Sequence, residues 1–217
     1  MEKRERLVLL ALGAASLVLR AIAFFHYRFD SDEQQHLHVS WGWTAGMVQY
    51  RDFFDNHTPL FHILTAPLLA ILGERSDILL WMRAPMLILF AIVSWATYVL
   101  ARDVYDRRIA LWTVVLLSLF PPFFLKSLEF RNDNLWTALS VLAMLGIVRH
   151  WRPFVIGLLL GAALATSIKT VFLVAALVVA RVILSRGEGR PARSAGGPSP
   201  SPRLRMTAAL AGFAIIP

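Results

Sequence analysis

The stretch LVLLALGAASLVLRAIAFF, residues 7–25, decides the fold class. It follows the charged N-terminus MEKRER and contains one charged residue, Arg20. A helix of about 20 apolar residues spans the hydrocarbon core of a bilayer. The stretch is longer than the apolar part of a signal peptide, no small-residue cleavage site follows it, and further apolar stretches do. We therefore predict that it is a retained first membrane span.

The composition extends this prediction to the whole chain. Hydrophobic residues make up 57% of the 217 residues, and the mean hydropathy is +0.59. The net charge of +8 does not indicate nucleic-acid binding, because the basic residues lie in short clusters between apolar stretches, as orientation signals do. The absence of cysteine excludes disulfides and thiolate metal sites. We predict an all-α, polytopic membrane protein with about six to seven spans and outer juxtamembrane helices.

The basic clusters set the topology. MEKRER and RDVYDRR (102–108) are expected in the cytoplasm. An even number of crossings must separate them, yet three apolar stretches lie between them. The stretch 59–73 is the shortest, would span about 22 Å as a helix against about 30 Å of hydrocarbon, and contains His62. We predict that it is a juxtamembrane helix within an outer loop of residues 26–82.

The second half of the chain also divides at a charged residue. Residues 153–184 would form a helix of about 48 Å, so we predict two short spans with Lys169 at the outer turn between them. The membrane module then covers 1–185. Residues 186–205 lack apolar periodicity and are expected to be a disordered cytoplasmic linker. Residues 206–217 begin a further span, which indicates the N-terminal part of a longer protein.

The first outer loop contains the densest group of ionisable residues, FDSDEQQHLHVS (29–40). SDEQ predicts a capping box, with Ser31 as N-cap and Gln34 at the third helical position. Asp32 would then be the first helical residue, where the helix dipole favours a carboxylate, and His36 would share its face. Such a carboxylate suits a general base or a cation ligand, although acids at a helix start also serve as caps alone.

Two further outer segments contribute polar residues. Arg131 and Asp133 lie in the second outer loop, KSLEFRNDN (126–134). Taken alone, Arg131 is an interface charge and Asp133 an N-cap. Lys169 is costly near hydrocarbon unless it pairs or faces water, which favours a functional role.

These residues occur in an order that resembles the polyprenyl-phosphate-dependent glycosyltransferases of the GT-C fold. The most similar branch holds the lipid A aminoarabinose transferases and the protein O-mannosyltransferases. The resemblance covers about residues 7–185. Its motifs are the acidic pair 32–33, RDFFDNHTPLFHIL (51–64), WMRAP (81–85), RNDN (131–134) and TSIKT (166–170).

The resemblance implies particular catalytic residues. It places Asp32 with Glu33 at the catalytic centre and makes Asp133 the second catalytic acid. The family's K-P-P-L stretch corresponds to HTPL (57–60), and its T-K-G stretch corresponds loosely to SIKT (167–170). The chain therefore departs from the family at the first two positions of HTPL, where His replaces Lys and Thr replaces Pro.

The implied function is transfer of a sugar from a polyprenyl-phosphate donor to a lipid, glycan or protein acceptor. The reaction would occur at the outer face of the plasma (inner) membrane, with inversion and with Asp32 as base. Lys169 and Arg131 would neutralise the leaving phosphate, and His57 and His36 complete the predicted substrate-binding set. No nucleic acid is expected as a partner.

Cofactors and alternative functions follow from the same residues. No organic cofactor is expected, and Asp133 would be the residue to hold a divalent cation if one takes part. His36 and His38 point to different faces of a helix, which argues against a histidine metal pair. A transporter is the main alternative, but it needs ionisable groups near the bilayer midplane, where Arg20 alone is expected. A non-catalytic membrane subunit is the third interpretation.

Overall fold

The computed structural model describes residues 1–188, and these fold entirely into helices and connecting loops. This confirms the all-α prediction for the described part of the chain. The structure divides into two units, 1–168 and 169–217, which are treated separately. The first unit contains α1 (Lys3–His26), α2 (Ser31–Thr44), α3 (Leu60–Leu72), α4 (Ile78–Val104), α5 (Arg107–Leu119), α6 (Pro121–Lys126), α7 (Asn132–Val148) and α8 (Pro153–Thr166), and the second contains α9 (Thr170–Glu188).

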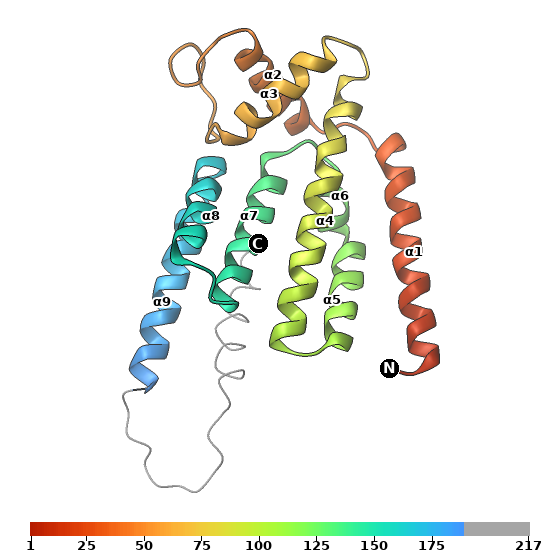
Figure 1. Ribbon diagram of the computed structural model, residues 1–217. Coiled ribbons are helices and arrows are strands. Elements are labelled where there is room, and N and C mark those ends of the chain that lie inside the picture. The colour runs from red at the N-terminus through yellow and green to blue at the C-terminus, as the bar shows by residue number, and fades with distance from the viewer. Residues whose placement is uncertain (189–217) are drawn as a thin grey trace, which may run out of the picture. The chain divides into compact units, whose positions relative to one another are not determined.

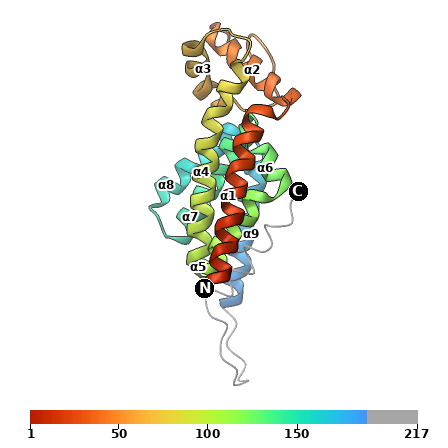
Figure 2. The same ribbon diagram turned by 90° about the vertical axis from the view of Figure 1, so that its right-hand side faces the viewer.

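The first unit has a bundle and a cap. Helices α1, α4, α5, α7 and α8 form the bundle, in which α4 packs against α5 and α7, and α7 packs against α8 (Figure 1). Helices α2 and α3 pack on each other beyond one end of the bundle, and the view in Figure 2 shows the same arrangement. We call residues 27–77 the cap. The C-terminal end of α1 and the N-terminal ends of α4 and α7 all point toward it.

Two of the described helices are long and apolar enough to cross a membrane, α1 with 24 residues and α4 with 27. Helices α3 and α8 are apolar but shorter. The number of six to seven spans therefore stays a prediction. The position of α3 on α2, within the cap, agrees with its predicted juxtamembrane place.

The start of α4 differs from expectation. The sequence placed residues up to 82 in the outer loop, with Pro85 in the first turn of the next helix, but α4 begins at Ile78 and contains Pro85 in its interior. Burial explains the longer helix, because Met82 and Arg83 are almost completely enclosed between the cap and the loop before α7. Helix α4 therefore includes residues 78–82, which were expected in the outer loop, and its first turns lie at the junction with the cap.

The predicted break at Lys169 is confirmed, since α8 ends at Thr166 and α9 begins at Thr170. Helix α9 runs to Glu188 and so includes the first three residues of the predicted linker 186–205. The rest of that linker and the predicted span at 206–217 lie outside the described residues.

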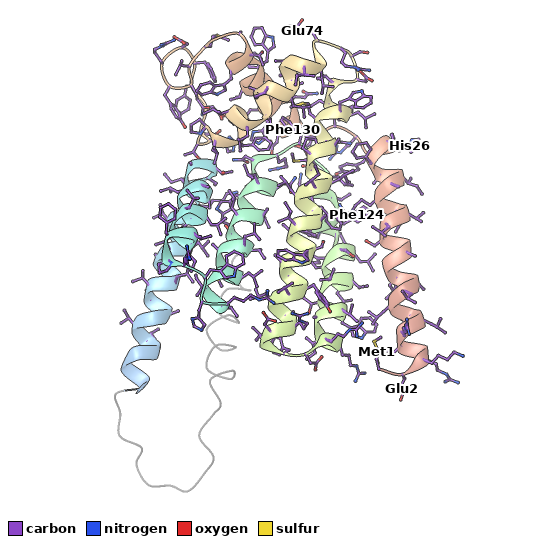
Figure 3. The ribbon with its side chains drawn as sticks, viewed as in Figure 1. Met1, Glu2, His26, Glu74, Phe124 and Phe130 are labelled. Atoms are coloured by element: carbon purple, nitrogen blue, oxygen red, sulfur yellow. The ribbon has the colours of Figure 1, made fainter. Side chains whose placement is uncertain are left out.

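A hydrophobic cluster joins the cap to the bundle. Phe61 and Leu69 of α3, Met82 and Met86 of α4, and Phe130 of the loop before α7 are all buried together. The Phe61 and Phe130 ring centroids are 4.9 Å apart. Figure 3 labels Phe130 at this junction, with His26 at the cap end of α1 and Met1 at the opposite end. Burial of this cluster fixes the cap against the residues that precede α7.

Candidate active site

The start of α2 has a capping box one residue earlier than predicted. Asp30, not Ser31, is the N-cap, and its Oδ1 accepts a hydrogen bond from the Asp32 N–H at 3.1 Å. The Glu33 carboxylate accepts from the Asp30 N–H at 3.0 Å. Aspartate caps helices as well as serine does, and this register places a glutamate at the third helical position, which completes the box. Asp32 is therefore the second helical residue.

Glu33 forms a buried ion pair with Arg83 of α4. Both side chains are 0% exposed, and the Arg83 Nε donates to Glu33 Oε2 at 2.8 Å. The other guanidinium nitrogens donate to the carbonyls of Tyr27 and Arg28 at 3.1 and 3.0 Å. The Phe130 N–H also donates to Glu33 Oε2, at 2.9 Å. Glu33 thus connects α2 to α4 and to the loop before α7, which is a positioning role.

Arg131 brings the two predicted catalytic aspartates together. Its Nη2 lies 2.7 Å from Asp32 Oδ2 and 3.5 Å from Asp133 Oδ2. Its Nη1 lies 3.0 Å from Oε2 of Glu129, which is fully buried. The guanidinium offsets the repulsion between carboxylates that start two different helices. The Asp32 and Asp133 side chains are 45% and 32% exposed, so solvent and substrates can reach both.

Lys126 extends this arrangement. Its Nζ lies 2.9 Å from Glu129 Oε2 and 3.4 Å from Asp30 Oδ2. The hydrogen bond from the Asp32 N–H lowers the pKa of the Asp30 carboxyl, and the Lys126 charge adds to this effect. We call the resulting group the Arg131 cluster: Asp30, Asp32, Lys126, Glu129, Arg131 and Asp133.

Three histidines and an aspartate form a second group inside the cap. His36 Nδ1 and His62 Nε2 are hydrogen-bonded at 2.9 Å, and both side chains are buried. Asp55 Oδ1 accepts from Gln35 at 2.8 Å and lies 3.4 Å from His57 Nδ1. Asp55 Oδ2 is 4.0 Å from His62 Nδ1, and both atoms are buried without a hydrogen-bond partner among the described residues. We call these residues, 36, 55, 57 and 62, the histidine group.

Burial keeps two of these imidazoles neutral. It lowers the pKa of His36 to about 3, with the neighbouring His62 and His57 adding to the effect, and it lowers the pKa of His62 to about 4. His36 is 1% exposed and is paired with His62, so its place favours support of the cap over direct contact with a substrate. His57 is more accessible, with 28% of its side chain exposed. Neither group forms a metal site by geometry among residues 1–188.

Arg20 connects the first helix to the same end of the bundle. Its guanidinium donates to Ser127 Oγ at 2.8 Å and lies 3.7 Å from the centroid of the Phe90 ring. Ser127 follows Lys126 directly, so Arg20 helps to hold the segment that leads to the Arg131 cluster. Lys169 begins the second unit, and its predicted role stays a prediction.

The sequence analysis assigned no site role to Arg83, Glu129, Asp55 or His62. Arg83 gave one usable signal, because a charge beside an apolar stretch needs a partner. His62 gave no such signal, because its partner His36 lies 26 residues away in the sequence. Glu129 gave none either, because its sequence neighbours include several charged residues and the sequence does not indicate which of them it contacts.

The model of the dolichyl-phosphate-mannose-protein mannosyltransferase family matches residues 56–216, which is most of the chain. The chain belongs to this family. Members are membrane glycosyltransferases of the GT-C type that use lipid-linked sugars, so this protein is an integral membrane protein of that class. The match includes Arg131 and Asp133 but begins after Asp32 and Glu33. Comparisons with curated proteins and with solved structures give no match.

Proposed function

We propose that Asp32 and Asp133, which Arg131 holds together, are the catalytic acids for transfer of a sugar from a polyprenyl-phosphate donor to an acceptor hydroxyl, with inversion at the anomeric carbon. The observation that carries the proposal is the shared guanidinium, because Arg131 contacts both Asp32 and Asp133. These are the acids that the resemblance makes catalytic, and they belong to different helices. Neither acid is the N-cap of its helix, because Asp30 caps α2 and Arg131 occupies the N-cap position of α7.

Asp32 is the carboxylate best placed to act as the base. Its side chain is 45% exposed, whereas Glu33 is fully buried against Arg83. Asp32 would accept the proton of the acceptor hydroxyl while the hydroxyl oxygen bonds to the anomeric carbon. The bond between that carbon and the phosphate oxygen breaks, and its electron pair leaves with the polyprenyl phosphate. Asp133 would orient the acceptor.

The charges in the cluster assign Arg131 a different role from the predicted one. Two cations, Lys126 and Arg131, face four carboxylates, so the formal charge of the cluster is −2. Arg131 would therefore hold Asp32 and Asp133 in position and leave the phosphate to another cation. The resemblance assigns that role to Lys169.

The remaining parts of the proposal concern location. We place the cluster at the outer face of the plasma (inner) membrane, with the N-terminus in the cytoplasm and about six to seven spans in total. The family is one of mannosyltransferases by its description, so mannose is the first donor sugar to test. Lipid, glycan and protein acceptors all remain candidates.

The test compares two neighbouring aspartates in protein reconstituted in bilayers with radiolabelled polyprenyl-phosphate mannose. Asp32→Asn should reduce sugar transfer or release by at least about a hundredfold, the usual effect of losing a general base. Asp30→Asn is the matched control, because it removes the same charge two residues away and asparagine also caps a helix well. It should retain most of the activity.

Equal loss in both variants would remove Asp32 from the proposed role, as would full activity in both. Other polyprenyl-phosphate sugars should be included, so that a failure with mannose is distinguished from a failure of the site.

A further inference from the structure

A groove lies at the end of the bundle opposite the cap, and none of the Arg131 cluster lines it. Helices α1, α4 and α5 enclose a groove of about 1050 Å³ there. Its walls are almost entirely apolar, and Leu10, Leu17, Leu111 and Val114 are among the lining residues. The groove therefore offers apolar surface that the described residues do not cover.

Three arginines, Arg6, Arg107 and Arg108, line the same groove. Arg108 pairs with Glu5, whereas Arg6 and Arg107 form no ion pair with any residue among 1–188. The N-terminus of α5 is already capped by the Asp106 carboxylate, which accepts from the Ile109 N–H at 2.8 Å. The attraction for an anion at the rim of the groove therefore comes from Arg6 and Arg107.

We propose that this groove binds an anionic phospholipid, with the phosphate at the arginines and one acyl chain between α1, α4 and α5. The dimensions agree. The α1 segment from Arg6 to Leu17 rises about 16 Å, which is close to half of the roughly 30 Å of hydrocarbon and thus to one leaflet. Basic pockets between membrane helices bind anionic headgroups in this way.

The combination of walls and rim excludes simpler occupants. A free phosphate would leave the apolar walls exposed, and a neutral phospholipid would leave two arginines without a counter-ion. The proposed reaction takes place at the Arg131 cluster, whereas these arginines line the groove together with Met1, which Figure 3 labels at the end of the bundle away from the cap. The site is therefore independent of the proposed reaction.

The experiment measures binding of lipids to the purified chain in detergent by native mass spectrometry. Phosphatidylglycerol and phosphatidylcholine with the same acyl chains differ only in the headgroup, which makes the first anionic and the second neutral overall, and phosphatidylglycerol should bind at least about tenfold more tightly. Arg6→Gln/Arg107→Gln should remove most of this preference, because each arginine should contribute about fivefold to the affinity for the anionic lipid. Arg4→Gln/Arg152→Gln is the matched control, since it removes two exposed arginines outside the groove.

A second variant tests the apolar part without removing charge. Gly13 lines the groove, and a Cβ at this position meets no atom within 4 Å, so Gly13→Phe is chosen to place an aromatic side chain in the groove. It should weaken the binding of phosphatidylglycerol, and glycerol 1-phosphate should not displace the lipid from the wild type.

Three results would overturn the proposal. The first is equal binding of the two phospholipids, and the second is equal loss of binding in both arginine variants. The third is displacement by glycerol 1-phosphate or by a polyprenyl phosphate at equal concentration, because the site would then belong to a free anion or to the donor's carrier lipid.

Discussion

Glu33 and Arg83 illustrate how one buried pair can position a site without taking part in it. Glu33 accepts hydrogen bonds from Arg83 and from the Asp30 and Phe130 N–H groups, and so joins α4 to two segments that carry an exposed acid. Helix α2 presents Asp32, and the loop before α7 leads to Asp133. Displacement of either segment would separate these two carboxylates.

The pair makes a prediction about stability. Glu33→Gln leaves the buried Arg83 charge without a counter-ion and should lower the free energy of unfolding by about 3–5 kcal/mol. Glu33→Leu/Arg83→Met removes both charges and should recover most of that loss, because an apolar pair of similar volume needs no desolvation of charge. Thermal unfolding in detergent measures both variants. A double variant as unstable as the single one would contradict this explanation.

The histidine group makes a prediction about pH. The unfolded chain protonates its histidines near pH 6.5, whereas His36 and His62 in the folded protein resist protonation until about pH 3 and 4. Their contribution to stability is therefore complete above pH 6.5 and is lost as the pH falls toward 4. Because of these two residues, the free energy of unfolding should be roughly 1–3 kcal/mol lower at pH 5.5 than at pH 7.5.

The comparison variant is His36→Gln/His62→Gln, which retains polar side chains but removes both titrating groups. Unfolding should be followed for both proteins between pH 5 and 8, and the wild type should lose more stability than the variant over this range. Parallel curves would show that the histidines do not control the pH dependence.

At the scale of the element, hydropathy was sufficient to locate most helices but not their first residues. The apolar stretches gave α1, α4 and the break between α8 and α9, because membrane helices must satisfy their own backbone hydrogen bonds. Three residues in a row, Asp30, Ser31 and Asp32, can each cap α2. The hydrogen bond from the Asp30 N–H to Glu33 is local, and DSDE (30–33) fits the capping-box pattern as well as SDEQ does. The pair between Glu33 and Arg83, which also favours this register, is a tertiary contact that the local sequence does not encode.

The same limit applies to the candidate site. The sequence identified Asp32, Asp133 and Arg131 as separate outer residues, and the structure places all three in contact. It did not identify the histidine group, because His36 was expected to share a face with Asp32 and instead pairs with His62 of α3. Pairing between side chains on separate helices leaves no periodic signal in one sequence.

At the scale of the first unit, successive bundle helices reverse direction, so the loops alternate between the cap end and the opposite end (Figure 1). The loop before α4 and the loop before α7 lie at the cap end. The turn between α4 and α5 lies at the opposite end and carries the basic residues 102–108. The positive-inside rule would place that turn in the cytoplasm and the cap outside.

Because the chain has no cysteine, single cysteines can test this arrangement directly. Ser76 of the cap and Tyr105 of the α4–α5 turn are both exposed, and neither substitution removes a basic residue. In sealed cells, a membrane-impermeant maleimide should label Ser76→Cys from outside. It should label Tyr105→Cys only after the cells have been permeabilised. The wild type serves as the unlabelled control. Labelling of both positions from one side would mean that α4 does not cross the membrane, and the placement of the Arg131 cluster at the outer face would fail with it.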